Sequence, residues 1–257
     1  MKNNINLIKA CFVLVLIGMM TGCGQFSGES SEQSKEILVM GTSADYEPFE
    51  FFDLENNEIV GFDVDIAHYI ATELGYELEI VDMDFNTLTT ALRTGKVDMV
   101  LAGMSPTPER EEVVDFTDIY YRATNLLITK TDVEFNGVED LNGRVLGAQT
   151  GTTQEETVFA LQEEGIKVEL NSMDRLPDLF QQLNAGRIDA IVIEDMATAT
   201  YLENNSSLTL IDILDNNEEG SAIAVQKGSE LKEQINEILK DMKENGELEA
   251  ISQKWFG

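Results

Sequence analysis

The strongest constraint on the fold of this chain is a nine-residue pattern that occurs twice, 91 residues apart. It reads LRTGKVDMV at Leu92–Val100 and LNAGRIDAI at Leu183–Ile191. Each copy fits the end of a helix, a glycine that closes it, a basic residue and a buried strand that opens with aspartate. The repeat predicts two α/β lobes of similar plan with a cleft between them.

Strands and helices are expected to alternate from Glu36 onward. Short apolar runs predict strands, and apolar residues at helical spacing followed by glycine predict helices. The expected strands are 37–41, a hairpin of 49–52 and 58–61, 78–81 and 97–101, and the expected helices are 63–74, capped by Asp63, 87–94, 154–164 and 230–245. This alternation is typical of a largely parallel sheet with helices on both faces.

Two apolar stretches, 126–129 and 221–225, flank the second copy of the pattern. Crossovers at these stretches would insert the second lobe into the first, with the C-terminal helix returning to lobe one. We therefore expect a first lobe at 37–125, a second lobe at 126–220 and a return to the first lobe at 221–257.

The charge of the chain limits its partners. Lysine and arginine number 17 against 48 acidic residues, which gives a formal net charge of -31. Such a surface repels phosphate backbones and anionic lipid headgroups, so nucleic-acid binding is excluded as a function class. The chain has one histidine and two cysteines, which are too few ligands for a zinc finger or a Cys/His cluster. We expect no metal and no cofactor.

The amino terminus resembles the signal of bacterial lipoproteins. Lys2 and Lys9 form a short positive region, and the uncharged apolar run Ala10–Met20 follows directly. This run is shorter than the roughly 20 residues that a membrane-spanning helix needs. The run is followed by Thr-Gly-Cys23, which resembles a lipobox. That resemblance implies a signal peptide at 1–22, lipidation of Cys23 with acyl chains such as palmitate, and a flexible tether at 23–36. The chain would then lie outside the cytoplasm, held to the membrane by the lipid alone, as on a Gram-positive cell surface.

Several stretches in order resemble the extracytoplasmic solute-binding proteins of bacterial polar amino acid ABC transporters. The stretches are Gly41–Phe51, Val60–Asp65, Leu101–Arg110, Val114–Tyr121, Gln149–Thr153 and Lys254–Gly257. The resemblance implies a type II periplasmic-binding-protein-like α/β fold, with two lobes joined by two hinge crossovers and a ligand cleft between them. It also implies a monomeric, non-enzymatic protein that captures a free L-amino acid by lobe closure and delivers it to permease subunits.

The residues that would hold the backbone of an amino acid follow from the charges of a zwitterion. Arg110 can grip a carboxylate through two parallel N–H bonds, which lysine could not reproduce. By resemblance, Ser105 and Thr153 add donors to the same carboxylate, and Gly103 lets the backbone approach closely. The ammonium group needs a carboxylate partner. The resemblance implies an acidic residue a few positions into the strand after the second repeat. Counting from Asp189 places Glu194 there, with Asp195 as the alternative, and we assign Glu194.

The other residues would surround the ligand side chain. Tyr46 and Phe85 match positions where the family stacks aromatic rings. Ser43 stands where glutamine and basic amino acid binders commonly carry aspartate. Gln149, together with Gln154, offers neutral groups at the same end of the pocket. The ligand therefore stays open within the glutamine, arginine, lysine and histidine class.

Two functions other than transport are possible on the same scaffold. One is an enzyme similar to cyclohexadienyl or arogenate dehydratases, in which Glu194 would protonate a leaving hydroxyl group. The other is the amino acid sensor domain of a receptor that reports to a separate membrane protein. The lipobox and the complete set of zwitterion contacts favour the transporter component.

Overall fold

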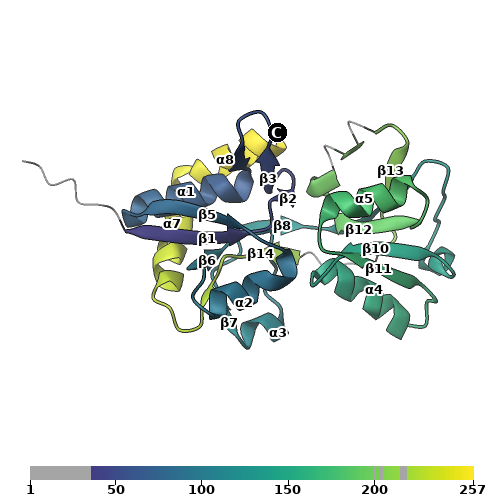
Figure 1. The fold of residues 1–257 in the computed structure, drawn as a ribbon, viewed down its shortest axis with the longest axis horizontal. Coiled ribbons are helices and arrows are strands. Elements are labelled where there is room, and N and C mark those ends of the chain that lie inside the picture. The colour runs from purple at the N-terminus through teal and green to yellow at the C-terminus, as the bar shows by residue number, and fades with distance from the viewer. Residues whose placement is uncertain (1–35, 199–200, 203–204, 215–218) are drawn as a thin grey trace, which may run out of the picture. The chain divides into compact units, whose positions relative to one another are not determined.

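The computed structural model describes residues 36–198, 201–202, 205–214 and 219–257. The expected signal peptide, Cys23 and all but the last residue of the expected tether lie outside these described residues. In the described part, two five-stranded sheets form the centres of two lobes (Figure 1).

The sheet of the first lobe has the strand order β5-β1-β6-β15-β7. Its strands are β1 (Ile37–Thr42), β5 (Glu77–Asp82), β6 (Met99–Val100), β7 (Val114–Phe116) and β15 (Ala224–Gln226). A small antiparallel sheet of β2 (Asp45–Tyr46), β3 (Glu50–Asp53) and β4 (Glu58–Val60) follows β1. The expected hairpin is therefore present, with one additional short strand before it.

The sheet of the second lobe has the order β11-β10-β12-β9-β13. Its strands are β9 (Asn125–Lys130), β10 (Val145–Gln149), β11 (Glu169–Met173), β12 (Ala190–Glu194) and β13 (Leu208–Ile211). Its helical elements are η2 (Val138–Leu141), α4 (Thr153–Glu163), α5 (Leu176–Asn184) and η3 (Met196–Thr198). The two-lobed α/β fold class is confirmed. The expected lobe boundaries at 126 and 221 stay a prediction.

Both sheets are largely parallel, as expected, but each is mixed because one strand runs against the other four. β15 runs antiparallel to β6 and β7, and β9 runs antiparallel to β12 and β13. These two strands are the ones that enter each sheet directly from a crossover. The crossovers themselves pair as β8 (Tyr121–Ala123) and β14 (Glu219–Ser221), an antiparallel ribbon that Figure 1 shows between the lobes.

The repeated sequence pattern forms the same structure in both lobes. Gly95 and Gly186 have positive φ angles of 72° and 68°, which close the preceding helices. The carboxylate of Asp98 then accepts a hydrogen bond of 2.8 Å from the backbone N–H of Val39 in β1. Asp189 accepts the same bond, also 2.8 Å, from Val145 in β10. Each aspartate thus fixes the register of its strand against a neighbouring parallel strand.

Alternating side chains of the central strands explain why helices cover both faces of each sheet. In β12, Ala190 and Val192 pack in the cluster that contains α4, whereas Ile191 and Ile193 pack in the cluster that contains α5. In the first lobe, Met99 and Val100 divide in the same way between the two clusters. Strands that are apolar on both faces are therefore buried on both faces.

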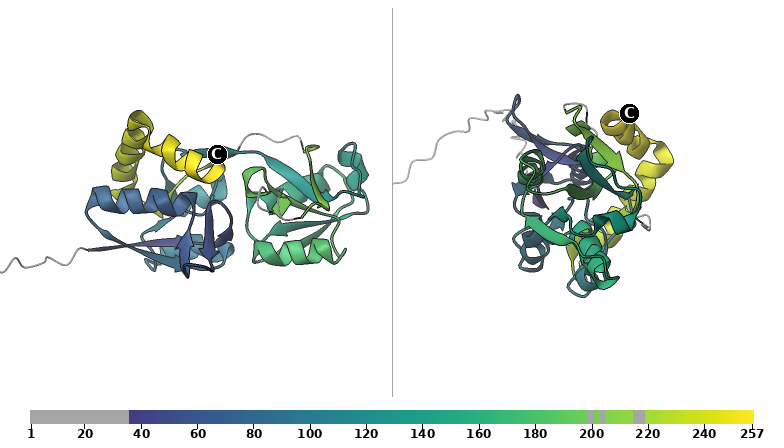
Figure 2. Two further views of the ribbon diagram at one scale, coloured as in Figure 1. Left: turned by 90° about the horizontal axis from the view of Figure 1, so that it is seen from above. Right: turned by 90° about the vertical axis from the view of Figure 1, so that its right-hand side faces the viewer.

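The remaining helices belong to the first lobe. They are α1 (Phe62–Leu74), η1 (Phe85–Thr87), α2 (Leu88–Arg93), α3 (Pro108–Glu111), α7 (Leu231–Asn245) and α8 (Glu247–Phe256). The C-terminal helices α7 and α8 pack against α1, as Figures 1 and 2 show in yellow and blue. The expected return of the chain to the first lobe at 221–257 stays a prediction, which these contacts support.

Asp63 does not cap α1 as expected. The helix begins one residue earlier, after Gly61, whose φ of 143° is open to glycine but strained for other residues. Asp63 is fully buried inside the first turn, where its carboxylate accepts bonds from the Gly103 N–H and the Tyr120 hydroxyl. The polar residue at the helix start therefore links α1 to the loop after β6.

Candidate functional site

The candidate site residues lie at the carboxyl ends of two parallel strands in each sheet, β1 and β6 in the first lobe and β10 and β12 in the second. The loop after β1 carries Ser43, and the loop after β6 carries Gly103 and Ser105. In the second lobe, Gln149 ends β10 and Glu194 ends β12. Ligands of open α/β sheets bind at the carboxyl ends of strands, so the topology itself selects these positions.

A cavity of about 330 Å³ lies among these residues and is lined by both lobes. All nine residues that the sequence nominated for ligand binding line it: Ser43, Tyr46, Phe85, Gly103, Ser105, Arg110, Gln149, Thr153 and Glu194. Gln154, which the sequence places with Gln149, lines it as well, and the structure adds Glu50, Ala102 and Thr152. Ligand contact by these residues stays a prediction.

Arg110 lies where the two lobes meet. Its Nη1 donates to the backbone carbonyl of Ser105 at 2.6 Å, and its Nη2 donates to the carbonyl of Gly151 at 2.8 Å. The guanidinium carbon lies 5.3 Å from the centre of the Phe85 ring. Thr107 caps the short helix α3 through the Arg110 N–H, which holds the arginine backbone in place. The guanidinium group is thereby fixed in orientation at the cavity wall.

The beginning of α4 supplies backbone donors to the same cavity. Thr152, rather than Thr153, caps this helix, since its hydroxyl accepts from the backbone N–H of Glu155. Thr153 is the first helical residue and is buried. The first N–H groups of a helix have no partner within the helix and carry partial positive charge. This end of the cavity is suited to an anion, together with Arg110.

The structure distinguishes the two acidic residues that the sequence left as alternatives. Glu194 is 2% exposed and lines the cavity. The side chain of Asp195 instead accepts from the backbone N–H of Met196 at 2.8 Å, and so is used in the turn after β12. The geometry therefore favours Glu194 as the partner for an ammonium group.

Tyr46 connects the aromatic wall of the cavity to Glu194. Its hydroxyl accepts a hydrogen bond of 3.4 Å from the backbone N–H of Glu194 in the opposite lobe. Burial, with the nearby carboxylate of Glu194, raises the pKa of Tyr46 well above its ordinary value. Tyr46 therefore remains a neutral ring beside Glu194 at any physiological pH.

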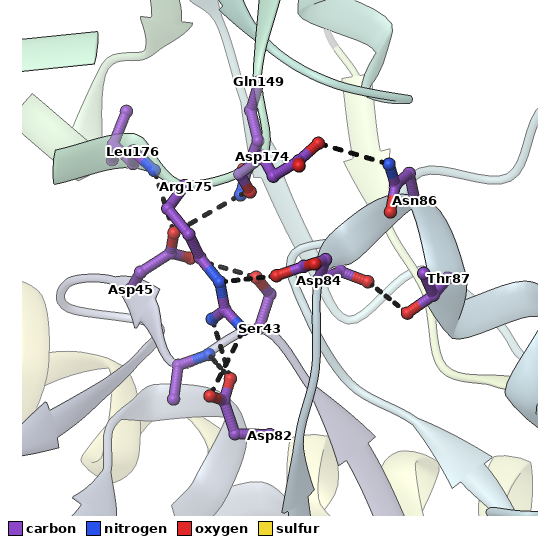
Figure 3. A network of polar contacts seen from close by, with 11 residues as sticks. Ser43, Asp45, Asp82, Asp84, Asn86, Thr87, Gln149, Asp174, Arg175 and Leu176 are labelled. Carbon is purple, nitrogen blue, oxygen red and sulfur yellow. Dashed lines mark hydrogen bonds and ion pairs between the residues drawn. The ribbon is translucent and has the colours of Figure 1, made fainter. Parts of the chain in front are cut away.

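Ser43 and Gln149 lie on opposite lobes and both contact Asp45. The hydroxyl of Ser43 donates to Asp45 at 3.0 Å, and the Gln149 amide donates to it at 3.5 Å (Figure 3). The backbone N–H of Leu176 donates to the same carboxylate at 2.8 Å. Burial raises the pKa of Asp45 despite these bonds. Position 43, where related binders commonly carry aspartate, therefore holds a serine, and the nearby acidic side chain is Asp45, two residues later.

A second contact between the lobes is ionic. Arg175, just before α5, pairs with Asp82 and Asp84 of the first lobe, both at 2.8 Å (Figure 3). Beside it, Asn86 donates to Asp174 at 3.4 Å. These contacts join the two lobes directly. Nothing in the sequence motifs singled out Arg175, because the pairing depends on how the lobes meet.

The described part of the chain offers neither a group of metal ligands nor a membrane-spanning helix. Among those residues, no three or more His, Cys, Asp or Glu side chains form a group that could hold a metal ion. None of the described helices is long and apolar enough to cross a membrane.

A polar cavity closed between two α/β lobes, with a cationic fork and a buried carboxylate on its walls, defines a two-lobed ligand-binding protein. Residues 38–257 match the family described as bacterial extracellular solute-binding proteins, family 3. The chain belongs to this family. The family is one of non-enzymatic binding proteins outside the cytoplasm, so the chain is an extracellular solute-binding protein.

Individual relatives are similar over nearly the whole chain. It is 46% identical over 253 residues to the arginine-binding extracellular protein ArtP of Bacillus subtilis (strain 168), covering 97% of this chain and 96% of ArtP. An ancestral arginine-binding protein solved with arginine is 37% identical with a TM-score of 0.80, covering 87% of this chain and 100% of that one. AbpA from Streptococcus pneumoniae, solved with L-arginine, is 34% identical with a TM-score of 0.80, covering 86% and 94%.

Proposed function

We propose that this protein captures free L-arginine between its lobes and delivers it to the permease of an ABC importer. The observation that carries the proposal is the cavity wall, which places Arg110 and Glu194 in opposite lobes with a polar cavity beside them. An amino acid backbone presents one anion and one cation, so these two side chains complement it. Two of the relatives are named arginine-binding proteins, and AbpA was solved with L-arginine bound, which supports arginine within the amino acid class.

Each part of the ligand would meet a different wall. The carboxylate would bind Arg110 and the first N–H groups of α4, and the ammonium group would bind Glu194. The side chain would lie along Tyr46 and Phe85, where a cation gains about 1–2 kcal/mol from an aromatic face. Because these groups come from both lobes, the ligand binds the closed form better than the open form and shifts the population toward it.

A thermal-shift panel tests the proposed ligand class. The chain from residue 24 retains every described element of both lobes, and refolding it strips carried-over ligand. We expect a clear rise in melting temperature with L-arginine, since a ligand at about 100 times its Kd adds roughly 2.7 kcal/mol. The panel contains the twenty L-amino acids with ornithine, citrulline and cystine, and prephenate serves as the substrate of the alternative enzyme. A response to prephenate alone, with none to any amino acid, would reject the proposal.

We further propose that Cys23 anchors the protein to the membrane by its lipid. The apolar run and the lipobox-like end of 1–22 support this, and an acylated cysteine with two or more chains gives stable attachment. The expected result of Cys23→Ala is release of the protein into the medium or failure of processing. Cell fractionation measures it, with Cys11→Ala in the expected signal as the matched control. Membrane attachment that survives the Cys23 change contradicts the anchor.

A further inference from the structure

Glu50 is a buried acidic residue that the zwitterion contacts do not use. It is 1% exposed on β3 and lines the cavity. One of its carboxyl oxygens, Oε2, is buried and has no hydrogen-bond partner. A buried polar atom without a partner costs about 1–3 kcal/mol, so such an atom on a cavity wall indicates a group that awaits a ligand.

The surroundings of Glu50 are acidic or neutral. Asp63 on α1 is hydrogen-bonded to it, and Asp45 on β2 and Glu194 on β12 lie close enough to act on it electrostatically. Tyr46 and Tyr120 also face it and have raised pKa values themselves, chiefly through burial. These neighbours favour the neutral form of Glu50 in the empty cavity.

The proton shared by Glu50 and Asp63 is held on Glu50. Burial, strengthened by the Asp63 carboxylate, raises the pKa of Glu50 well above its ordinary value. Burial also raises the pKa of Asp63, but only to about 6, because the Gly103 N–H and the Tyr120 hydroxyl stabilise its charged form. At neutral pH the pair therefore carries one negative charge, on Asp63, and one proton, on Glu50.

Arginine brings one more positive charge than a zwitterion, and the cavity needs a second acidic group beside Glu194 to match it. Asp45 is already hydrogen-bonded through both carboxylate oxygens, by Ser43 on one side and by Leu176 and Gln149 on the other. With Glu194 assigned to the ammonium group, Glu50 is the remaining acidic residue of the cavity wall, and its Oε2 has no hydrogen-bond partner. An unpaired guanidinium group in such a site would be strongly disfavoured.

We propose that Glu50 is the residue that makes the cavity select a cationic side chain, and that it gives up its proton when that side chain binds. This inference rests on the proposed amino acid binding function. In the binding step the O–H bond of Glu50 breaks, the proton passes to solvent, and the carboxylate pairs with the guanidinium group. Each charge of the ligand then has a partner of opposite sign, and the Asp63 charge stays on its hydrogen bonds from the Gly103 N–H and the Tyr120 hydroxyl.

The pH dependence follows with a definite sign. The cation binds the ionised form of Glu50, whereas the empty cavity holds the protonated form. Arginine affinity therefore rises with pH below the pKa of Glu50 in the empty protein, by up to about tenfold per pH unit, and levels off above it. A neutral ligand of the same length shows no such rise.

Citrulline provides that neutral ligand, since a urea group replaces the guanidinium group on the same side chain. Calorimetric titrations of the refolded chain with arginine and citrulline, in buffers of different ionisation enthalpy, count the protons released. We expect release of up to one proton with arginine and none with citrulline. In Glu50→Gln, arginine affinity falls about 100-fold and its proton release disappears, whereas citrulline affinity changes less than about threefold.

The outcomes separate this inference from the proposed function. Equal losses for arginine and citrulline in Glu50→Gln would mean a structural role, and unchanged arginine affinity would mean no role; either overturns the inference alone. If Glu50→Gln does not fold, as judged by circular dichroism, proton release by the unaltered protein decides. Arginine binding without proton release overturns the inference. Failure of the unaltered protein to bind any amino acid overturns the proposed function instead.

Discussion

Replacing Arg110 by methionine is expected to weaken arginine binding by about 3–5 kcal/mol, which is several hundredfold or more. The change removes the cationic fork and leaves the ligand carboxylate with the neutral donors of Ser105 and α4. Arg110→Lys keeps the charge but cannot make two parallel bonds, so we expect an intermediate loss. Calorimetric titration of the refolded variants measures both effects.

The control for Arg110 is Arg93→Met, at an exposed arginine near the end of α2. It makes the same chemical change in the same lobe away from the cavity and is expected to leave affinity unaltered. Arg110 also donates to two backbone carbonyls, so melting temperatures of the unliganded variants are compared. Full arginine affinity in Arg110→Met would remove this residue from the site.

Replacing Glu194 by glutamine is expected to cost about 2–5 kcal/mol of ligand affinity. The side chain is buried, and its amide replacement cannot balance the charge of the ligand ammonium group. The loss should be similar for arginine and citrulline, because both carry the same ammonium group. This common loss distinguishes Glu194 from Glu50, whose replacement should affect arginine alone.

Asp195→Asn is the matched control for Glu194. It makes the same acid-to-amide change one residue along, at a side chain that accepts from the Met196 N–H in a turn. We expect a small decrease in stability and little change in affinity. If Asp195→Asn abolishes binding and Glu194→Gln does not, the ammonium partner has been assigned to the wrong residue.

The sequence predicted the two-lobe plan because local rules dominate it. The repeated glycine and aspartate occupy equivalent positions, where Asp98 and Asp189 make the same bond to a neighbouring strand. The nine nominated residues were placed by motif resemblance, and they line one cavity because the strands that precede several of them end together. Both results depend on short-range pattern and topology.

What the sequence did not predict depends on tertiary contacts. The antiparallel direction of β9 and β15 follows from how the chain crosses between lobes, which no local pattern encodes. Arg175 finds its aspartate partners only where the lobes meet. Asp63 has the sequence context of a helix cap, yet it is buried in bonds to Gly103 and Tyr120.

Glu50 was missed for a related reason. It lies in a run of aromatic residues that indicates a half-buried hairpin, and a glutamate there is ordinarily expected to face solvent. One signal was available, because a hairpin over these residues pairs Glu50 directly with Tyr46, which the motifs had already assigned to the pocket. Cross-strand pairing with a nominated residue is therefore a useful criterion for further site residues.

The most direct test of capture between the lobes is small-angle X-ray scattering of the refolded chain during titration with L-arginine. We predict that the radius of gyration falls as arginine is added and reaches a plateau at one ligand per chain. Arg110→Met at the same arginine concentrations is predicted to remain expanded. If calorimetry shows that arginine is bound while the scattering of the unaltered protein does not change, closure around the ligand is contradicted.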